Sequence, residues 1–199
     1  VYKRQLKMKA KKRFGQNFLT DKKLLEDLIS LISMSSQDKF LEIGPGKGDL
    51  TENLINFCDC YFGIEVDRDL LTVLKNRFPK NKKAFINRDI LKLNPSEIYP
   101  LNKFRVIGNI PYNISSPILD WCEKNYEKIL DVHFMLQKEF ALRCIGNERS
   151  SSYGKLSVIC NYLYEVTILK EVTKDFFNPI PKVDSLFVRF SPKKNTLDM

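Results

Sequence analysis

The sequence predicts an α/β fold with a mostly parallel sheet, helices on both faces and an antiparallel pair of strands at one edge. Short strand-like runs alternate with helical segments between residues 40 and 145. A glycine-rich turn joins the first of these strands to its helix, and two further β-like runs lie close together near the C-terminal end. Such alternation favours parallel strands joined by crossover helices.

The chain begins with a basic arm. Residues 1–13 contain no acid and seven cationic side chains: Lys3, Arg4, Lys7, Lys9, Lys11, Lys12 and Arg13. The other 186 residues hold 26 basic and 24 acidic side chains, so most of the net charge of +9 lies in the arm. Phosphates attract such a segment, which fits nucleic acid as a partner. A solvated tail that improves solubility is the plainer interpretation, and charge alone leaves both open.

The predicted elements follow in order. After a short segment at residues 14–19, Thr20 or Asp21 caps a helix that extends to Ile32. Apolar runs predict strands at residues 40–43, 60–66, 84–86, 104–108 and 132–136. Helical spacing predicts helices at residues 50–57, 69–78, 117–126, 138–145 and 156–164. The last two strands, at residues 166–172 and 183–190, are expected to pair antiparallel at the sheet edge.

Composition excludes several classes of protein. No apolar run exceeds three residues, which excludes a membrane span, and no apolar stretch follows the arm as it does in a secretory signal. The five cysteines form no disulfide-like pattern, which indicates a reducing compartment, so a cytoplasmic location is expected. No metal is expected, because Cys58 and Cys60 are separated by one residue and His133 is the only histidine. His133 lies in an apolar run and is expected in the core.

The first motif with chemical meaning is the turn Glu42-Ile43-Gly44-Pro45-Gly46-Lys47-Gly48. Glycines between a strand and a helix let a ligand approach the backbone closely. Their spacing is G-x-G-x-G, and Asp49 stands where the third glycine of a dinucleotide site would be. An acid there discourages a pyrophosphate and suits a cofactor without phosphate, such as S-adenosylmethionine. An ordinary glycine-rich turn is the plainer interpretation of this motif alone.

Two carboxylates follow at the ends of the next strands. Glu65 ends the second strand, where it can accept hydrogen bonds from both hydroxyls of a ribose. Asp67 competes for that role but is better placed to cap the next helix. Asp89 follows the third strand, where it can accept from an adenine amine or serve as a turn residue. Three elements in the right order on successive strands favour a nucleoside-containing cofactor.

The fourth strand runs into Asn109-Ile110-Pro111-Tyr112. An adenine amine is a weak nucleophile because its lone pair is conjugated with the ring. Two acceptors on its N–H groups, the Asn109 side-chain oxygen and the Ile110 carbonyl, would favour a tetrahedral nitrogen aligned with a methyl donor. Pro111 stiffens the turn without adding a donor, and Tyr112 offers a face for stacking the base. The motif predicts methylation of an adenine amine without a histidine base.

A second aromatic group lies in the proline-containing loop after residue 175. Phe177 is predicted to close the other side of an extruded base. The competing interpretation is that these phenylalanines belong to the core near the edge strand. That interpretation is expected to apply to Phe176 more than to Phe177.

Together these residues resemble the bacterial small-subunit ribosomal RNA adenine dimethyltransferase family of the KsgA type. The matches cover nearly the whole chain in order: residues 12–19, 42–48, 109–115, 135–139, 153–157 and 177–185. The resemblance implies a Rossmann-like class I S-adenosylmethionine-dependent methyltransferase with a seven-stranded sheet. It also implies dimethylation of N6 of two adjacent adenines, in a hairpin loop near the 3′ end of small-subunit (16S) rRNA, during biogenesis of that subunit.

The resemblance also assigns site residues. Together with the glycine turn it predicts these cofactor contacts: Asn17, Leu19, Gly44, Gly46, Glu65, Asp89 and Asn109. Asn109, Pro111 and Tyr112 match the catalytic motif, and Phe177 matches the second base-stacking aromatic. The expected partner is small-subunit rRNA or the pre-small ribosomal subunit, bound in part by the basic arm. With no obvious dimer seam, a monomer is expected.

Two features depart from the family pattern. Members usually continue into a small helical C-terminal domain, so the sequence predicts an arm at 1–13, a catalytic domain at 14–192 and a tail at 193–199 that stops before that domain. Asn-Ile-Pro-Tyr replaces the commoner Asn-Leu-Pro-Tyr and is familiar from large-subunit (23S) rRNA methyltransferases of the macrolide-resistance type. Arg13-Phe14-Gly15 and Pro45 favour the small-subunit enzyme. A non-catalytic rRNA-binding assembly factor is the remaining alternative, against which the intact motif argues.

Overall fold

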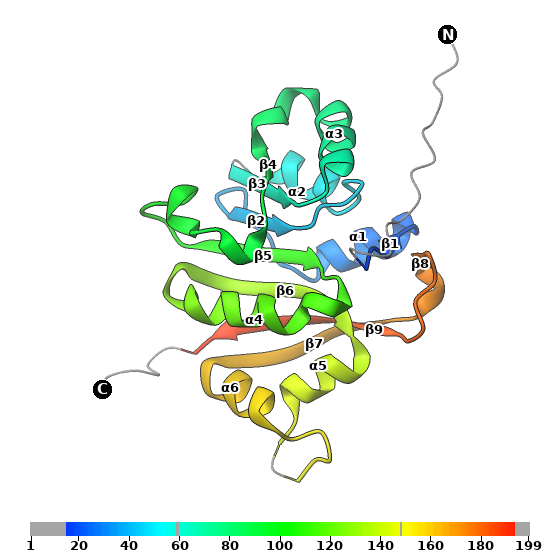
Figure 1. The fold of residues 1–199 in the computed structure, drawn as a ribbon, viewed down its shortest axis with the longest axis vertical. Coiled ribbons are helices and arrows are strands. Elements are labelled where there is room, and N and C mark those ends of the chain that lie inside the picture. The colour runs from blue at the N-terminus through cyan, green and yellow to red at the C-terminus, as the bar shows by residue number, and fades with distance from the viewer. Residues whose placement is uncertain (1–14, 59, 148, 194–199) are drawn as a thin grey trace.

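The computed structural model describes residues 15–58, 60–147 and 149–193, and its centre is a seven-stranded sheet (Figure 1). Neighbouring strands follow the order β4-β3-β2-β5-β6-β9-β7. The first five are parallel: β4 (Phe85–Asn87), β3 (Cys60–Glu65), β2 (Lys39–Ile43), β5 (Phe104–Asn109) and β6 (Ile129–Gln137). β9 (Ser185–Pro192) pairs antiparallel with both β6 and β7 (Tyr164–Val172). The predicted α/β architecture is confirmed, although only β7 lies at the edge because β9 inserts beside β6.

In the described part of the chain, six helices cover the two faces of the sheet. They are α1 (Lys22–Ser30), α2 (Thr51–Phe57), α3 (Arg68–Arg77), α4 (Ser115–Lys124), α5 (Lys138–Ile145) and α6 (Lys155–Leu163). Side chains alternate across each strand, so Phe40 of β2 belongs to the apolar cluster that includes residues of α1, α2 and α3, whereas Leu41 belongs to the cluster that includes residues of α4, α5 and α6. Each predicted helix is present within about two residues of its expected bounds.

Short elements fill the connections. Short 3₁₀ segments occur at η2 (Pro79–Ala84), η3 (Ile90–Lys92), η4 (Pro95–Glu97), η5 (Tyr112–Ile114), η6 (Tyr126–Lys128) and η7 (Lys174–Phe176). Outside the main sheet, β1 (Phe18–Leu19) pairs antiparallel with β8 (Phe177–Asn178), beside α1 in Figure 1. The sequence did not predict this pair, because a two-residue strand shows no periodicity.

Several expectations concern single residues or segments. His133 is fully buried on β6, so its predicted place in the core is confirmed. All five cysteines are free. Within the described residues, none of the helices has the length and apolar character needed to cross a membrane. The basic arm at residues 1–13 lies outside the described residues.

Candidate active site

A cavity of about 280 Å³ opens at the carboxyl ends of β2, β3 and β5. Ligands of open α/β sheets bind at this edge, because the strand ends and the following turns converge there. Every predicted cofactor contact lines the cavity: Asn17, Leu19, Gly44, Gly46, Glu65, Asp89 and Asn109. The rest of the predicted catalytic motif, residues 110–112, lines it too. One fold therefore brings together side chains that span more than ninety positions of the chain.

The glycine turn forms one wall of this cavity. Gly44, Gly46 and Gly48 have φ values of +63°, +62° and +87°, which side chains other than glycine rarely adopt. A Cβ at Gly44 would meet no atom within 4 Å, so this backbone borders open space in the cavity. Asp49 also lines the cavity, but its carboxylate pairs with Arg77 at 3.0 Å. At Gly44 the turn thus offers backbone to a ligand, and the acid beside the turn is paired with Arg77, which also pairs with Glu52.

Glu65 is held at the end of β3 by backbone donors. Its Oε2 accepts from the Gly46 N–H at 3.1 Å, and its Oε1 accepts from the Asp67 N–H at 2.9 Å. The side chain is 4% exposed, and burial raises its pKa. Each oxygen retains a second lone pair, so the carboxylate can accept from hydroxyl groups of a ligand without losing its own support.

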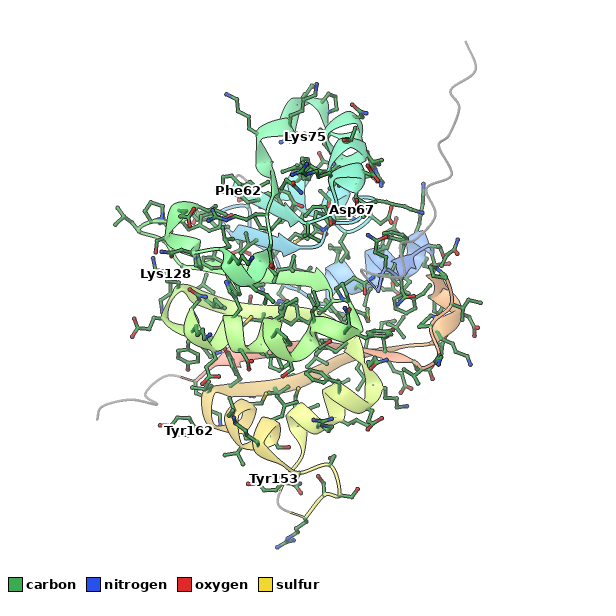
Figure 2. All side chains as sticks on the ribbon, in the orientation of Figure 1. Phe62, Asp67, Lys75, Lys128, Tyr153 and Tyr162 are labelled. Carbon is green, nitrogen blue, oxygen red and sulfur yellow. The ribbon has the colours of Figure 1, made fainter. Side chains whose placement is uncertain are left out.

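Two aspartates show how helix capping competes with ligand contact. Asp67 caps α3 as predicted: its side chain accepts from the Asp69 N–H at 3.0 Å, and Gln16 donates to its other oxygen at 3.2 Å. It is labelled in Figure 2, between α3 and α1. Asp89 caps η3 through Oδ1, which accepts from the Leu91 N–H at 3.0 Å, while the residue also lines the cavity. The turn role of Asp89 is therefore present, and its place in the cavity is compatible with the predicted ligand role.

Asn109 ends β5, and its amide has a defined orientation. Nδ2 donates to the Asn17 carbonyl oxygen at 2.7 Å. A carbonyl only accepts, so the amino group must face Asn17 and Oδ1 is the end available to a donor. The Ile110 N–H donates to the Met135 carbonyl at 3.2 Å, and its side chain is buried. These contacts fix the backbone and the amide of the predicted catalytic motif.

Tyr112 begins the short helix η5 and is half-buried at the cavity wall. Its hydroxyl lies 2.9 Å from Ser185 Oγ, across 73 positions of sequence. Burial raises the pKa of Tyr112, so the phenol stays protonated at neutral pH. The ring is therefore anchored at its far end while it lines the cavity.

The expectation for the two phenylalanines was wrong in one respect. Phe177 is 2% exposed in the core beside Leu19, whereas Phe176 is 36% exposed. Phe177 is buried because β8 pairs with β1. The sequence did not predict β1, so it gave no reason to expect Phe177 in the core. Phe177 does not line the cavity in this conformation, so its stacking on a base requires movement of β8 and stays a prediction.

Sequence reasoning missed two supporting residues. Ser185 carries the hydroxyl that meets Tyr112, and no local pattern indicates that contact. Glu42 lines the cavity, and its Oε2 accepts from Tyr61 at 2.6 Å and Thr51 at 2.7 Å. Burial raises the pKa of Glu42 to about 7. Its position in the glycine motif was visible, but the two donors come from separate elements.

A family model described as ribosomal RNA adenine dimethylase matches residues 7–199. The chain belongs to the ribosomal RNA adenine dimethylase family. Members of this family are S-adenosylmethionine-dependent methyltransferases, and the cavity fits such a cofactor: it has a glycine backbone facing open space and a buried carboxylate at the end of β3. The family assignment also confirms the resemblance and the fold class predicted from the motifs.

Relatives and solved structures agree with this dimethylase assignment. The chain is 42% identical to ribosomal RNA small subunit methyltransferase A of Methylobacillus flagellatus, over 94% of this chain and 72% of the relative. It is 40% identical to the protein of the same name from Coxiella burnetii, over 95% and 74%. A dimethyladenosine transferase from Plasmodium falciparum superposes with a TM-score of 0.79 at 30% identity, over 90% and 64%. The 23S rRNA methyltransferase ErmE superposes with a TM-score of 0.79 at 29% identity, over 92% of this chain and 73% of ErmE.

Proposed function

We propose that this chain dimethylates N6 of two adjacent adenines in a hairpin loop near the 3′ end of small-subunit rRNA, as a step in biogenesis of that subunit. The observation that carries the proposal is the Asn109 amide, held by the Asn17 carbonyl beside Tyr112 in the cavity. The names of the relatives support small-subunit rRNA as the substrate, and a cytoplasmic location is part of the same proposal.

The chain's own residues supply orientation and electrostatics. Asn109 Oδ1 and the Ile110 carbonyl accept the two N–H bonds of the target amine, which favours a tetrahedral nitrogen with its lone pair free. Tyr112 stacks on the base, and the buried wall formed by Ile110 keeps water from the reacting nitrogen. Glu65 and Asp89 orient the cofactor from the neighbouring strands. When bound, S-adenosylmethionine supplies an electrophilic methyl group on its sulfonium.

The domain boundaries belong to the same proposal. Residues 14–192 form the catalytic domain, and the arm at residues 1–13 adds a sequence-independent share of RNA affinity through its seven cations. Deleting residues 1–13 is expected to flatten the dependence of RNA affinity on salt concentration, measured as log Kd against log salt. An unchanged slope would assign no phosphate contact to the arm.

Methylation of large-subunit rRNA is the less favoured alternative. The Asn-Ile-Pro-Tyr motif and the likeness to ErmE point that way. Identity over the aligned chain points the other way, at 42% to a small-subunit relative against 29% to ErmE. A purely structural assembly role is less favoured still, because the oriented Asn109 amide serves no such role.

The deciding experiment is transfer of labelled methyl groups from S-adenosylmethionine to small subunits that lack dimethyladenine. Label at the two adjacent adenines, lost in Asn109→Ala, is the expected result. Large-subunit rRNA is assayed in parallel. Label there alone would replace the proposal with the alternative, and cofactor binding without label on either RNA would refute catalysis by this chain.

A further inference from the structure

The contact between Tyr112 and Ser185 joins the predicted base-stacking ring to a part of the fold far away in sequence. The two oxygens lie 2.9 Å apart, which is a good hydrogen-bond distance between hydroxyl groups. Tyr112 is half-buried and lines the cavity, whereas Ser185 is fully buried. The bond therefore forms between a ring that faces the ligand space and a group that water does not reach.

The backbone of Ser185 is held by neighbouring strands on both sides. This residue is the first of β9, and it pairs with Gln137 of β6 on one side and with Val172 of β7 on the other. The preceding residue, Asp184, is also fixed: its carbonyl accepts from the Lys138 N–H at 3.0 Å, and its carboxylate accepts from the Lys174 N–H at 2.9 Å. A serine has a single rotatable bond before its oxygen, so the hydroxyl inherits the rigidity of this backbone.

Tyr112 needs such a support. Its backbone lies in a short 3₁₀ turn between β5 and α4, with no hydrogen-bonded sheet neighbour. A ring on such a turn can tilt about two side-chain torsions, and ordering those torsions on binding weakens affinity. A bond at the phenol oxygen, at the far end of the ring, fixes the tilt before the base arrives. Stacking depends on that tilt, because the planes of the base and the ring must be nearly parallel.

We propose that Ser185 is a positioning residue for methyl transfer, because its hydroxyl holds the Tyr112 ring in the plane on which the target adenine stacks. This proposal rests on the proposed function and deepens it. Ser185 contacts neither base nor cofactor, and it acts through Tyr112. The loss of either hydroxyl removes the same bond, so the two residues form one unit.

The test is a double-mutant cycle on the full chain. The variants are Ser185→Ala, Tyr112→Phe and the double variant, with Ser185→Thr as the rescue. Each single variant is expected to reduce kcat/KM for rRNA about tenfold, the effect of one hydrogen bond to a half-buried hydroxyl. The double variant is expected to lose no more than either single variant, because the bond is lost only once. Ser185→Thr keeps a hydroxyl and is expected to restore most of the activity.

A second measurement reports ring position without methyl transfer. An RNA hairpin with 2-aminopurine at the target position is expected to show fluorescence quenching on binding, weaker in Ser185→Ala and in Tyr112→Phe. Ser191→Ala, on the same strand but near its other end, is the matched control and is expected to match the parent. The dissociation constant of S-adenosylmethionine is expected to stay unchanged in Ser185→Ala, and the unfolding midpoint is expected to fall only slightly, so that the variant stays folded under the assay conditions.

The outcomes separate the two proposals. Parent-level activity and quenching in Ser185→Ala, or losses that multiply in the double variant, would overturn the role of Ser185. Loss of activity accompanied by an equal loss of folded protein would also overturn it, in favour of a packing role. Quenching by the parent without label on any rRNA would instead overturn the proposed function and leave the ring contact standing.

Discussion

The Asn109 side-chain nitrogen donates to the Asn17 carbonyl oxygen at 2.7 Å, although 92 positions separate the two residues. Asn17 belongs to the segment that precedes β1, and Asn109 ends β5 in the centre of the sheet. The segment at residues 15–19 also lines the cavity. A segment that lines the cavity therefore sets the orientation of the predicted catalytic amide.

This contact predicts that Asn109→Asp is more harmful than its small change in shape suggests. A carboxylate only accepts, so it would face the Asn17 carbonyl without a donor between them. We expect methyl transfer to fall at least 100-fold, an effect of about 3 kcal/mol on the transition state. Single-turnover transfer of labelled methyl measures it. Asn102→Asp, an exposed amide that does not line the cavity, is the matched control, and an Asn109→Asp enzyme with parent activity would contradict the orientation argument.

Gly48 illustrates a second constraint, on the stability of the glycine turn. Its φ is +87°, and an added Cβ would lie 2.6 Å from Phe78 Cε2 and 3.1 Å from Leu74 Cδ2. Both side chains belong to packed structure at the end of α3, so the neighbours must shift. Gly48→Ala is expected to destabilise the fold by about 1–3 kcal/mol, measured by urea unfolding. Gly154→Ala, with no atom within 4 Å and an extended backbone, is expected to change stability by less than about 1 kcal/mol.

The comparison of Gly48 with Phe177 shows what sequence can predict and what it cannot. The glycine turn, the alternation of strands and helices, and the capping role of Asp67 follow from local spacing, and the structure has all three. Phe177 was misjudged because its burial depends on pairing with Leu19, a contact between distant two-residue strands. Ser185 was missed for the same reason. Local chemistry is readable from sequence, but contacts between remote short elements leave no periodic pattern.

The buried ion pairs of Arg105, away from the cavity, predict that replacing this residue strongly lowers the stability of the fold. Its guanidinium is buried and makes a two-point contact with Asp131, at 2.8 and 2.7 Å, and a 2.7 Å contact with Asp38. Removing the cation leaves two partly buried carboxylates without their partner. Arg105→Ala is expected to cost about 3–5 kcal/mol in unfolding free energy. Arg88→Ala, which removes an exposed pair with Glu97, is expected to cost less than about 1 kcal/mol, and equal losses would contradict this account.

Glu42 predicts a pH dependence of stability. Burial raises its pKa from 4.5 to about 7, although Tyr61 and Thr51 donate to it. The folded carboxyl therefore keeps its proton between pH 4.5 and 7 while the unfolded one releases it, so its contribution to stability falls as pH rises through this window. The contribution of His133 to stability changes with pH in the opposite direction. Burial lowers the pKa of His133 from 6.5 to about 4, so its contribution rises with pH between those values.

Glu42→Gln isolates the first of these two effects. Glutamine does not titrate, and its side-chain oxygen can still accept from Tyr61 and Thr51. Relative to the parent, the variant is expected to gain about 2–3 kcal/mol of unfolding free energy on going from pH 5 to pH 8. The His133 contribution is common to both proteins and cancels in this difference. Urea unfolding at the two pH values measures it, and a difference that does not change with pH would show that Glu42 is already ionised in the fold at pH 5.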